Sequence, residues 1–182
     1  MIKLKSLLPL VIAAAGVTGI PAAHAADGTI KFVGEIKGNI CKISGGGAAG
    51  PNFTVTMDPV SITALTKAGE VAGSKPFSIE LYDCNPDSGT VQTLFESASN
   101  IDINTNNLKL DGGGAENVQI RLLNAADNSR IMLGLGSEAQ NSQSVKLSGG
   151  KASLKYYTQY YATGAAKPGK VSTAVTYSIF YR

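Results

Sequence analysis

The sequence GTIKFVGEIKGNIC, at residues 28–41, alternates between apolar or small residues and mostly polar ones. Its even positions are Gly28, Ile30, Phe32, Gly34, Ile36, Gly38 and Ile40. A period of two is typical of a β-strand that turns one face to a core and the other to water. A second segment of this kind, residues 170–181, ends the chain. Strands at both ends of a chain raise the question of which neighbour each one pairs with.

The first 25 residues have the three parts of a secretory signal peptide. Lys3 and Lys5 form a basic start, residues 7–20 are apolar or small, and AHA at residues 23–25 fits the cleavage rule. Subtracting 25 leader residues from 182 leaves a mature chain of 157, which is enough for one domain with a proper core. The alternative is an uncleaved anchor, although the apolar run is short for a membrane span.

The composition of the mature chain argues against catalysis and against nucleic-acid binding. Without Lys3 and Lys5, 14 basic residues stand against 13 acidic ones, and the charges are scattered. The only histidine, His24, lies in the leader, so histidine-based catalytic pairs and the common zinc sites are excluded. A pair of carboxylates remains possible in principle, but no acidic residue stands in an apolar context. We expect no enzyme activity, no catalytic or metal site, no cofactor and no nucleic-acid partner.

Cys41 and Cys84 are the only cysteines. In an exported chain, an even number of cysteines is read by default as a disulfide, and this one would close a loop of 44 residues, counted from Cys41 to Cys84. The alternative is two free, buried thiols.

The rest of the chain is rich in short strand patterns separated by turn residues. Predicted strands lie at residues 53–57, 76–84, 91–98, 118–123, 131–135, 145–147, 152–163 and 170–181. Residues 44–51, SGGGAAGP, predict a flexible loop, residues 61–69 have weak helical character, and residues 100–114 predict short strand pieces joined by turns. Many strands and almost no helix favour an all-β sandwich with Greek-key connections over a barrel or an α/β fold.

Four tyrosines, Tyr156, Tyr157, Tyr160 and Tyr161, form a dense aromatic group. Such a group can be a platform for sugars or for single-stranded nucleic acid. On a strand, however, Tyr156 and Tyr160 share one face while Tyr157 and Tyr161 share the other. We therefore expect half of them in the core.

The mature chain resembles the major structural subunits of chaperone–usher fimbriae, the type 1 and related adhesive pili of Gram-negative bacteria. The resemblance rests on GTIKFVGEI followed five residues later by Cys41, on Cys84 after FSIELYDC, and on the C-terminal YYTQYYATGAAKPGKVSTAVTYSIFYR. Gly169, fourteenth from the end, and Tyr181, the penultimate residue, are marks of this family. The glycine-rich residues 44–51 depart from the family pattern.

This resemblance implies an incomplete immunoglobulin-like β-sandwich, which a donor strand from a neighbouring subunit or a chaperone completes. Strand addition of this kind gives a head-to-tail polymer that does not close. The implied partners are identical or related pilin subunits, a periplasmic chaperone and an outer-membrane usher, with the membrane met only in transit. The implied location is an extracellular fimbrium on the cell surface, reached through the periplasm.

The resemblance also assigns roles to parts of the chain. Residues 1–25 are the cleaved signal peptide, residues 26–40 the donor-strand extension with the start of the first strand, and residues 41–182 the pilin sandwich. The donor strand would insert Ile30, Phe32, Gly34 and Ile36. The groove edge and chaperone contact would comprise Gly169, Val175, Tyr177, Ile179 and Tyr181.

Two other functions remain as alternatives. The chain could be a minor pilus subunit such as an adaptor. It could also be a monomeric secreted β-sandwich that binds carbohydrate, in which residues 28–40 would pair within their own sheet.

Overall fold

The computed structural model describes residues 31–33, 38, 40–96 and 98–182. The chain divides into two compact units, Met1–Ile36 and Lys37–Arg182. In the first unit, the described residues 31–33 are exposed and belong to no strand. Among all described residues, no helix is long and apolar enough to cross a membrane.

The described part of the second unit contains ten strands and one short 3₁₀ helix. The elements are β1 (Ile40–Gly45), β2 (Ala48–Ala49), η1 (Ile62–Ala64), β3 (Val71–Asn85), β4 (Gly89–Phe95), β5 (Ile101–Asp102), β6 (Asn107–Lys109), β7 (Glu116–Asn124), β8 (Ser144–Leu147), β9 (Ala152–Lys167) and β10 (Tyr177–Tyr181).

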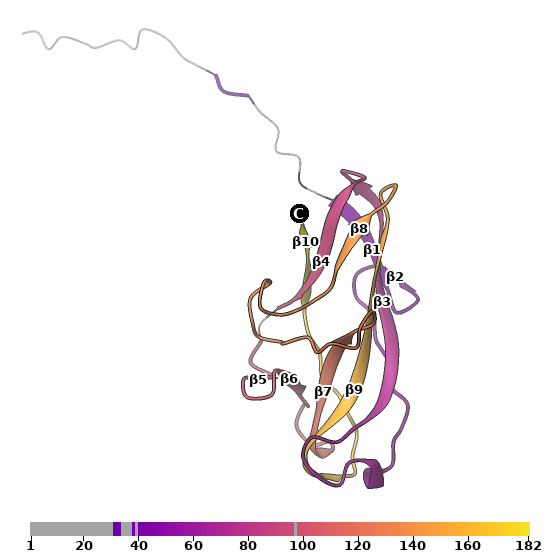
Figure 1. Ribbon diagram of the computed structural model, residues 1–182, viewed down its shortest axis with the longest axis vertical. Coiled ribbons are helices and arrows are strands. Elements are labelled where there is room, and N and C mark those ends of the chain that lie inside the picture. Colours follow the sequence, from indigo (N-terminus) through magenta and orange to yellow (C-terminus); the bar gives the residue numbers. More distant parts are fainter. Residues whose placement is uncertain (1–30, 34–37, 39, 97) are drawn as a thin grey trace, which may run out of the picture. The chain divides into compact units, whose positions relative to one another are not determined.

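The strands form two antiparallel sheets (Figure 1). One has seven strands in the order β2-β1-β3-β9-β7-β6-β5, and the other has three in the order β10-β4-β8. The long strands β3 and β9 pair from Val71 opposite Tyr161 to Leu81 opposite Ala152, and β7 lies on the other side of β9. This arrangement confirms the prediction of an all-β fold made of two sheets.

The core lies between the two sheets, and β9 supplies much of it. Its residues Leu154, Tyr156, Thr158, Tyr160 and Ala162 alternate along the strand, and all five are buried. Tyr157 and Tyr161, one position out of phase, are only half-buried. The predicted division of the tyrosines between two faces is therefore confirmed, and it leaves no continuous platform of four rings.

Residues 44–51 were expected to form a flexible loop, and this is wrong. The strand β1 runs to Gly45 and turns back as β2, with Gly45 opposite Ala48. The two residues of the turn, Gly46 and Gly47, have φ values of +58° and +83°. Glycine adopts this left-handed region without strain, and two such residues make the hairpin turn whose twist matches that of β-strands.

Two predicted strands are not strands in the structure. Residues 131–135 follow a single β-bridge between Leu123 and Arg130 and continue as a loop. Residues 53–57 are extended, and Phe53, Val55 and Met57 alternate in burial as a strand would, but they belong to neither sheet. The pattern correctly indicated which side chains turn inward, because burial sets the pattern whether or not the backbone is paired.

Of the two strands predicted at the ends of the chain, one is largely untested and the other is shorter than predicted. The expected strand at residues 28–41 falls mostly outside the described residues, and the first described strand begins at Ile40. The last strand begins at Tyr177 rather than at residue 170. The weak helical signal at residues 61–69 corresponds to the single 3₁₀ turn η1, whose backbone Thr63 N–H donates to the Ser61 hydroxyl.

Candidate functional site

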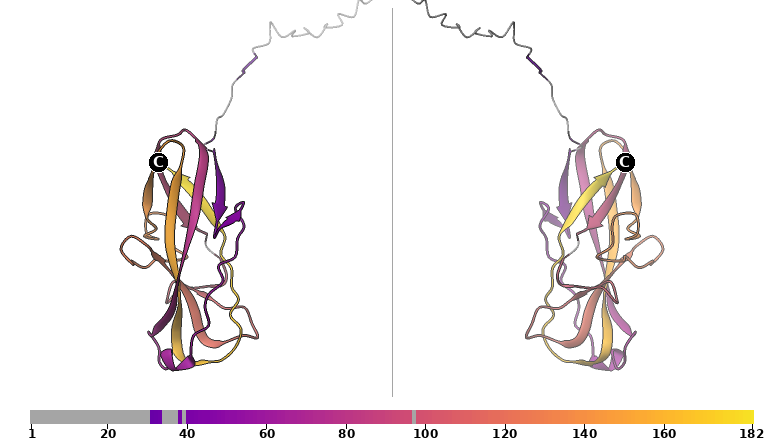
Figure 2. Two further views of the ribbon diagram at one scale, coloured as in Figure 1. Left: turned by 90° about the vertical axis from the view of Figure 1, so that its right-hand side faces the viewer. Right: turned by 90° about the vertical axis from the view of Figure 1, so that its left-hand side faces the viewer.

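A long groove with a volume of about 1030 Å³ runs between two extended segments of the second unit. Residues 51–57, which follow β2, form one wall, and residues 171–179 with Tyr181 form the other. Figure 2 shows these two segments, purple and yellow, along the same side of the unit. We call them the first wall and the second wall.

The second wall is the outer edge of the smaller sheet. Its strand β10 pairs with β4 from Tyr177 opposite Phe95 to Tyr181 opposite Val91. In the sheet order β10 has no second neighbour among the described strands. Upstream of β10, the carbonyls of Lys170 and Ser172 accept hydrogen bonds from the backbone N–H groups of Ala115 and Asp111. The wall is thus held from one side, and its other edge faces the groove.

The first wall has even fewer backbone partners. Within the described residues, no backbone–backbone hydrogen bond joins residues 51–57 to a strand. The wall is instead held by side chains. The Phe53 ring packs against Gly45 and Gly46 of the β1–β2 hairpin, and the Tyr160 hydroxyl donates to the carbonyl of Asp58, just beyond the wall, over 3.3 Å. The groove therefore lies between two strand-like edges whose backbone groups can still pair.

Side chains alternate in the same way along both walls. Phe53, Val55 and Met57 turn inward on the first wall. Val175, Tyr177, Ile179 and Tyr181 turn inward on the second, while the residues between them are exposed. All of these inward side chains except Val55 pack against the buried core. Burial against the core raises the pKa of both Tyr177 and Tyr181.

The floor of the groove is apolar and comes from both sheets. It consists of Phe77, Ile79, Phe95, Leu108, Ile120, Leu122, Thr158 and Tyr160. A strand laid between the walls would place alternate side chains on this floor and would pair its backbone with both edges. The groove has the shape and chemistry of a site for one missing strand.

The predicted site residues are distributed as follows. Val175, Tyr177, Ile179 and Tyr181 line the groove, and Gly169 lies before it, in the segment between β9 and β10. Phe32, in the other unit, is 89% exposed. Ile30, Gly34 and Ile36 lie outside the described residues.

The predicted disulfide is present. The sulfur atoms of Cys41 and Cys84 are 2.00 Å apart, and the bond ties β1 to β3. Both cysteines are at least partly buried against the core. The expectation of a bridge closing the 44-residue loop is confirmed, and the alternative of two free thiols is excluded.

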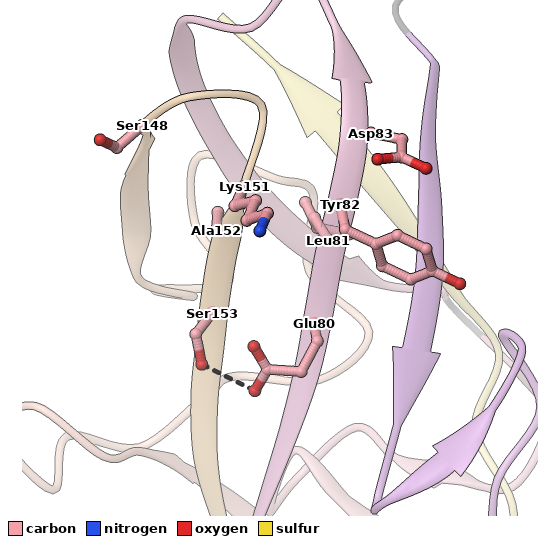
Figure 3. A pocket seen from close by; sticks show the side chains of 8 residues that line it. All are labelled: Glu80, Leu81, Tyr82, Asp83, Ser148, Lys151, Ala152 and Ser153. Atoms are coloured by element: carbon pink, nitrogen blue, oxygen red, sulfur yellow. Dashed lines mark hydrogen bonds between the residues drawn. The ribbon is translucent and has the colours of Figure 1, made fainter.

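A second, shallower hollow of about 570 Å³ lies over β3 and the start of β9 (Figure 3). Its polar side chains include Glu80, Asp83 and Lys151, and the Ser153 hydroxyl donates to Glu80 over 2.8 Å. The described residues contain no group of three or more histidine, cysteine or acidic side chains that could hold a metal ion. The residues that line this hollow include no histidine and no group that could hold a metal ion, so the groove is the stronger candidate site.

The fold and the groove define a β-sandwich that lacks one strand, and comparison with known proteins identifies its class. The family described as type-1 fimbrial protein, A matches residues 57–182. The chain belongs to this family of fimbrial proteins.

Particular relatives support this assignment. The major fimbrial subunit SMF-1 of Stenotrophomonas maltophilia (strain K279a) is 42% identical over 167 residues, covering 88% of this chain and 95% of the relative. The F17 fimbrial protein of Escherichia coli is 36% identical over 187 residues, covering all of both chains. The chain is therefore a structural subunit of a fimbria rather than an enzyme, and its place is the extracellular fimbria, reached through the periplasm.

Solved structures agree on the fold. The P pilus rod subunit PapA superposes with a TM-score of 0.58 at 19% identity, over 78% of this chain and 99% of that one. A subunit of a chaperone–usher pilus superposes with a TM-score of 0.57 at 18% identity, over 90% of this chain and 100% of that one. The two sheets thus have the immunoglobulin-like arrangement of pilin subunits.

Proposed function

We propose that the groove receives the N-terminal extension of the next subunit, so that each copy completes the sandwich of its neighbour. The observation that carries this proposal is the pair of facing walls, each with an unpaired backbone edge above an apolar floor. Addition of a strand to such edges supplies backbone hydrogen bonds for affinity and side-chain pockets for register. The contact is head-to-tail and does not close, so it produces a filament.

The extension has the sequence that such a groove requires. Ile30, Phe32 and Ile36 are the proposed anchors, and Gly34 between them is proposed to pass a part of the groove that is too tight for a side chain. Full burial of three such apolar side chains is worth roughly 5–9 kcal/mol by transfer. The 89% exposure of Phe32 is consistent with this role, because the ring buries little of its surface in its own subunit and is available to the groove of another.

An unpaired strand edge beside an apolar groove is also a hazard. Before the next subunit arrives, such a surface promotes aggregation. We infer that a periplasmic chaperone covers the groove first, through β10 and the C-terminal residues, and that an outer-membrane usher exchanges the chaperone for the next subunit. Residues 1–25 are then the signal peptide that brings the chain to the periplasm.

Two matched variants test the proposal. Gly34→Leu adds a side chain at a position that should face the floor, whereas Lys31→Leu adds the same side chain at a position that should face water. We expect Gly34→Leu to yield folded, chaperone-bound subunit but no fibres. We expect Lys31→Leu to yield both the chaperone-bound subunit and fibres. Normal fibres from Gly34→Leu would contradict the proposed donor strand.

The C-terminal strand provides a separate test of chaperone capture. Deletion of residues 180–182 removes the end of β10 and should abolish co-purification with the chaperone. Undiminished co-purification would show that the chaperone binds elsewhere.

A further inference from the structure

The two walls of the groove contact each other at one position along its length, which we call the level of Tyr177. The Tyr177 hydroxyl on the second wall donates a hydrogen bond to the carbonyl oxygen of Pro51 on the first wall, over 2.7 Å. The Tyr177 ring also lies 6.3 Å from the Phe53 ring, measured between centroids. All three residues line the groove. One phenol side chain therefore bridges the space in which the proposed donor strand would lie.

Phe53 has little room to move away from this contact. A Cβ atom on Gly46 would come within 2.9 Å of the Phe53 ring, and one on Gly45 would overlap it, so the ring rests directly on the hairpin backbone. The Phe53 ring also lies 6.4 Å from the Phe77 ring of the floor, measured between centroids. Phe53 is thus packed against both the hairpin and the floor.

The Tyr177 side chain can leave this contact while its backbone stays paired with Phe95 of β4. Tyr177 is the first residue of β10, and the residues before it belong to no strand. Its hydroxyl has one described partner, the Pro51 carbonyl, and that hydrogen bond is exposed to solvent. Rotation of one side chain and loss of one hydrogen bond are enough to separate the walls at this level.

From this geometry we infer that Tyr177 is a gate residue for strand insertion, and the inference rests on the function proposed above. A strand that pairs with the first wall needs the wall carbonyls as acceptors, and Tyr177 holds the carbonyl of Pro51. The phenol must swing away from Pro51 and Phe53 before the strand can occupy this level. The gate acts on the rate of insertion, because the bond that it breaks belongs to the unfilled groove and not to the filled one.

Removal of the hydroxyl should therefore accelerate insertion. A net hydrogen bond of ordinary strength corresponds to about a 2- to 10-fold change in rate. Tyr177→Phe should increase the association rate constant by this factor and leave the dissociation rate constant unchanged. A merely structural role for Tyr177 would instead lower the melting temperature and speed dissociation.

The experiment uses the mature full-length chain, refolded from denaturant at low concentration and isolated as a monomer by size exclusion. It is mixed at once with a large excess of a fluorescent peptide with the sequence of residues 26–39, so that the peptide outcompetes the chain's own extension. Association and dissociation are followed by anisotropy, and the melting temperature by circular dichroism. Tyr181→Phe is the matched control. It removes a hydroxyl group from the same strand, and this hydroxyl has no described hydrogen bond to the first wall. Phe53→Leu is a second variant, which removes the ring contact but keeps the wall apolar.

Faster association of Tyr177→Phe and Phe53→Leu, with dissociation unchanged and Tyr181→Phe like the wild type, is the expected result. Equal association rates for all four proteins would overturn the gate and leave the groove as the acceptor. Failure of every protein to take up the peptide would overturn the proposed function and the gate with it.

Discussion

Gly114 and Gly169 cross with their backbones in direct contact. A Cβ atom on Gly169 would lie only 2.5 Å from the carbonyl carbon of Gly114, and one on Gly114 would overlap the carbonyl oxygen of Lys170. Neither glycine has a left-handed φ, so the crossing requires space rather than conformational freedom. This crossing sets the point from which the chain turns onto the second wall of the groove.

Gly169→Ala should therefore destabilise the subunit and displace the second wall. Overpacking at such a contact costs about 1–3 kcal/mol. The matched control is Gly112→Ala, since a Cβ at Gly112 would meet nothing within 4 Å. In urea unfolding, Gly169→Ala alone should have a lower free energy of unfolding than the wild type. Equal stability of the two variants would mean that the backbone can relax around the crossing.

The disulfide between Cys41 and Cys84 should matter for stability more than for shape. Removing a native bridge from a small exported domain costs about 2–5 kcal/mol. The double variant Cys41→Ala/Cys84→Ala should unfold at lower urea concentration than the wild type and match the wild type measured in reductant. A double variant with wild-type stability would show that the bridge is dispensable.

Gln140 should be one of the few polar residues whose loss is severe. It is completely buried, and its side-chain amide makes the two hydrogen bonds that a neighbouring strand would otherwise make with the last residue of β4. The oxygen accepts from the Phe95 N–H and the nitrogen donates to the Phe95 carbonyl, both over 2.8 Å. Gln140→Ala leaves two buried backbone groups without a partner and should cost about 2–4 kcal/mol.

A comparable glutamine serves as the control for that measurement. Gln143 is half-buried, and within the described residues its amide donates only to the Lys155 carbonyl. Gln143→Ala should cost less than about 1 kcal/mol. Similar losses for Gln140→Ala and Gln143→Ala in urea unfolding would refute the special role of Gln140.

Stability should be insensitive to pH near neutrality and should fall in acid. The backbone N–H of Asn104, followed by the Gln119 amide, lowers the pKa of Asp102, and hydrogen bonds from Ser129 lower the pKa of Asp127. A carboxylate with a lower pKa in the folded state stabilises the fold above its unfolded pKa of about 3.9, and this contribution is lost as the pH falls through the folded pKa.

Because the only histidine, His24, lies in the proposed signal peptide, melting temperatures should be nearly constant from about pH 5 to 8 and should drop below about pH 4. Asp102→Asn should reduce the size of the acid drop. A transition between about pH 5.5 and 7 would contradict this assignment.

Local patterns predicted the long strands well. The period of two at residues 76–84 and 152–163 predicts β3 and β9, because each is buried on one face along much of its length. The same pattern at residues 53–57 correctly predicted inward side chains but not the absence of a paired strand. Alternation reports which face is buried, and it carries no information about which backbone, if any, lies alongside.

The groove, too, could be predicted from the sequence only in part. Its second wall, at Val175, Tyr177, Ile179 and Tyr181, was predicted from the family resemblance of the C-terminus. The first wall was missed, although its alternation at residues 53–57 was visible in the sequence. Its place opposite β10 depends on contacts between residues far apart in the chain, such as Pro51 with Tyr177, and no local pattern encodes them.

The central claim is that each subunit completes the groove of the next with its N-terminal strand. The most direct test is a denaturing gel of purified surface material, with one sample heated and one unheated. Strand-exchanged polymers dissociate very slowly, so the unheated lane should show a ladder at integer multiples of the mature subunit mass, and boiling should collapse it to one band. A single monomer band in both lanes would contradict the claim and would mean that the N-terminal strand is used within its own subunit.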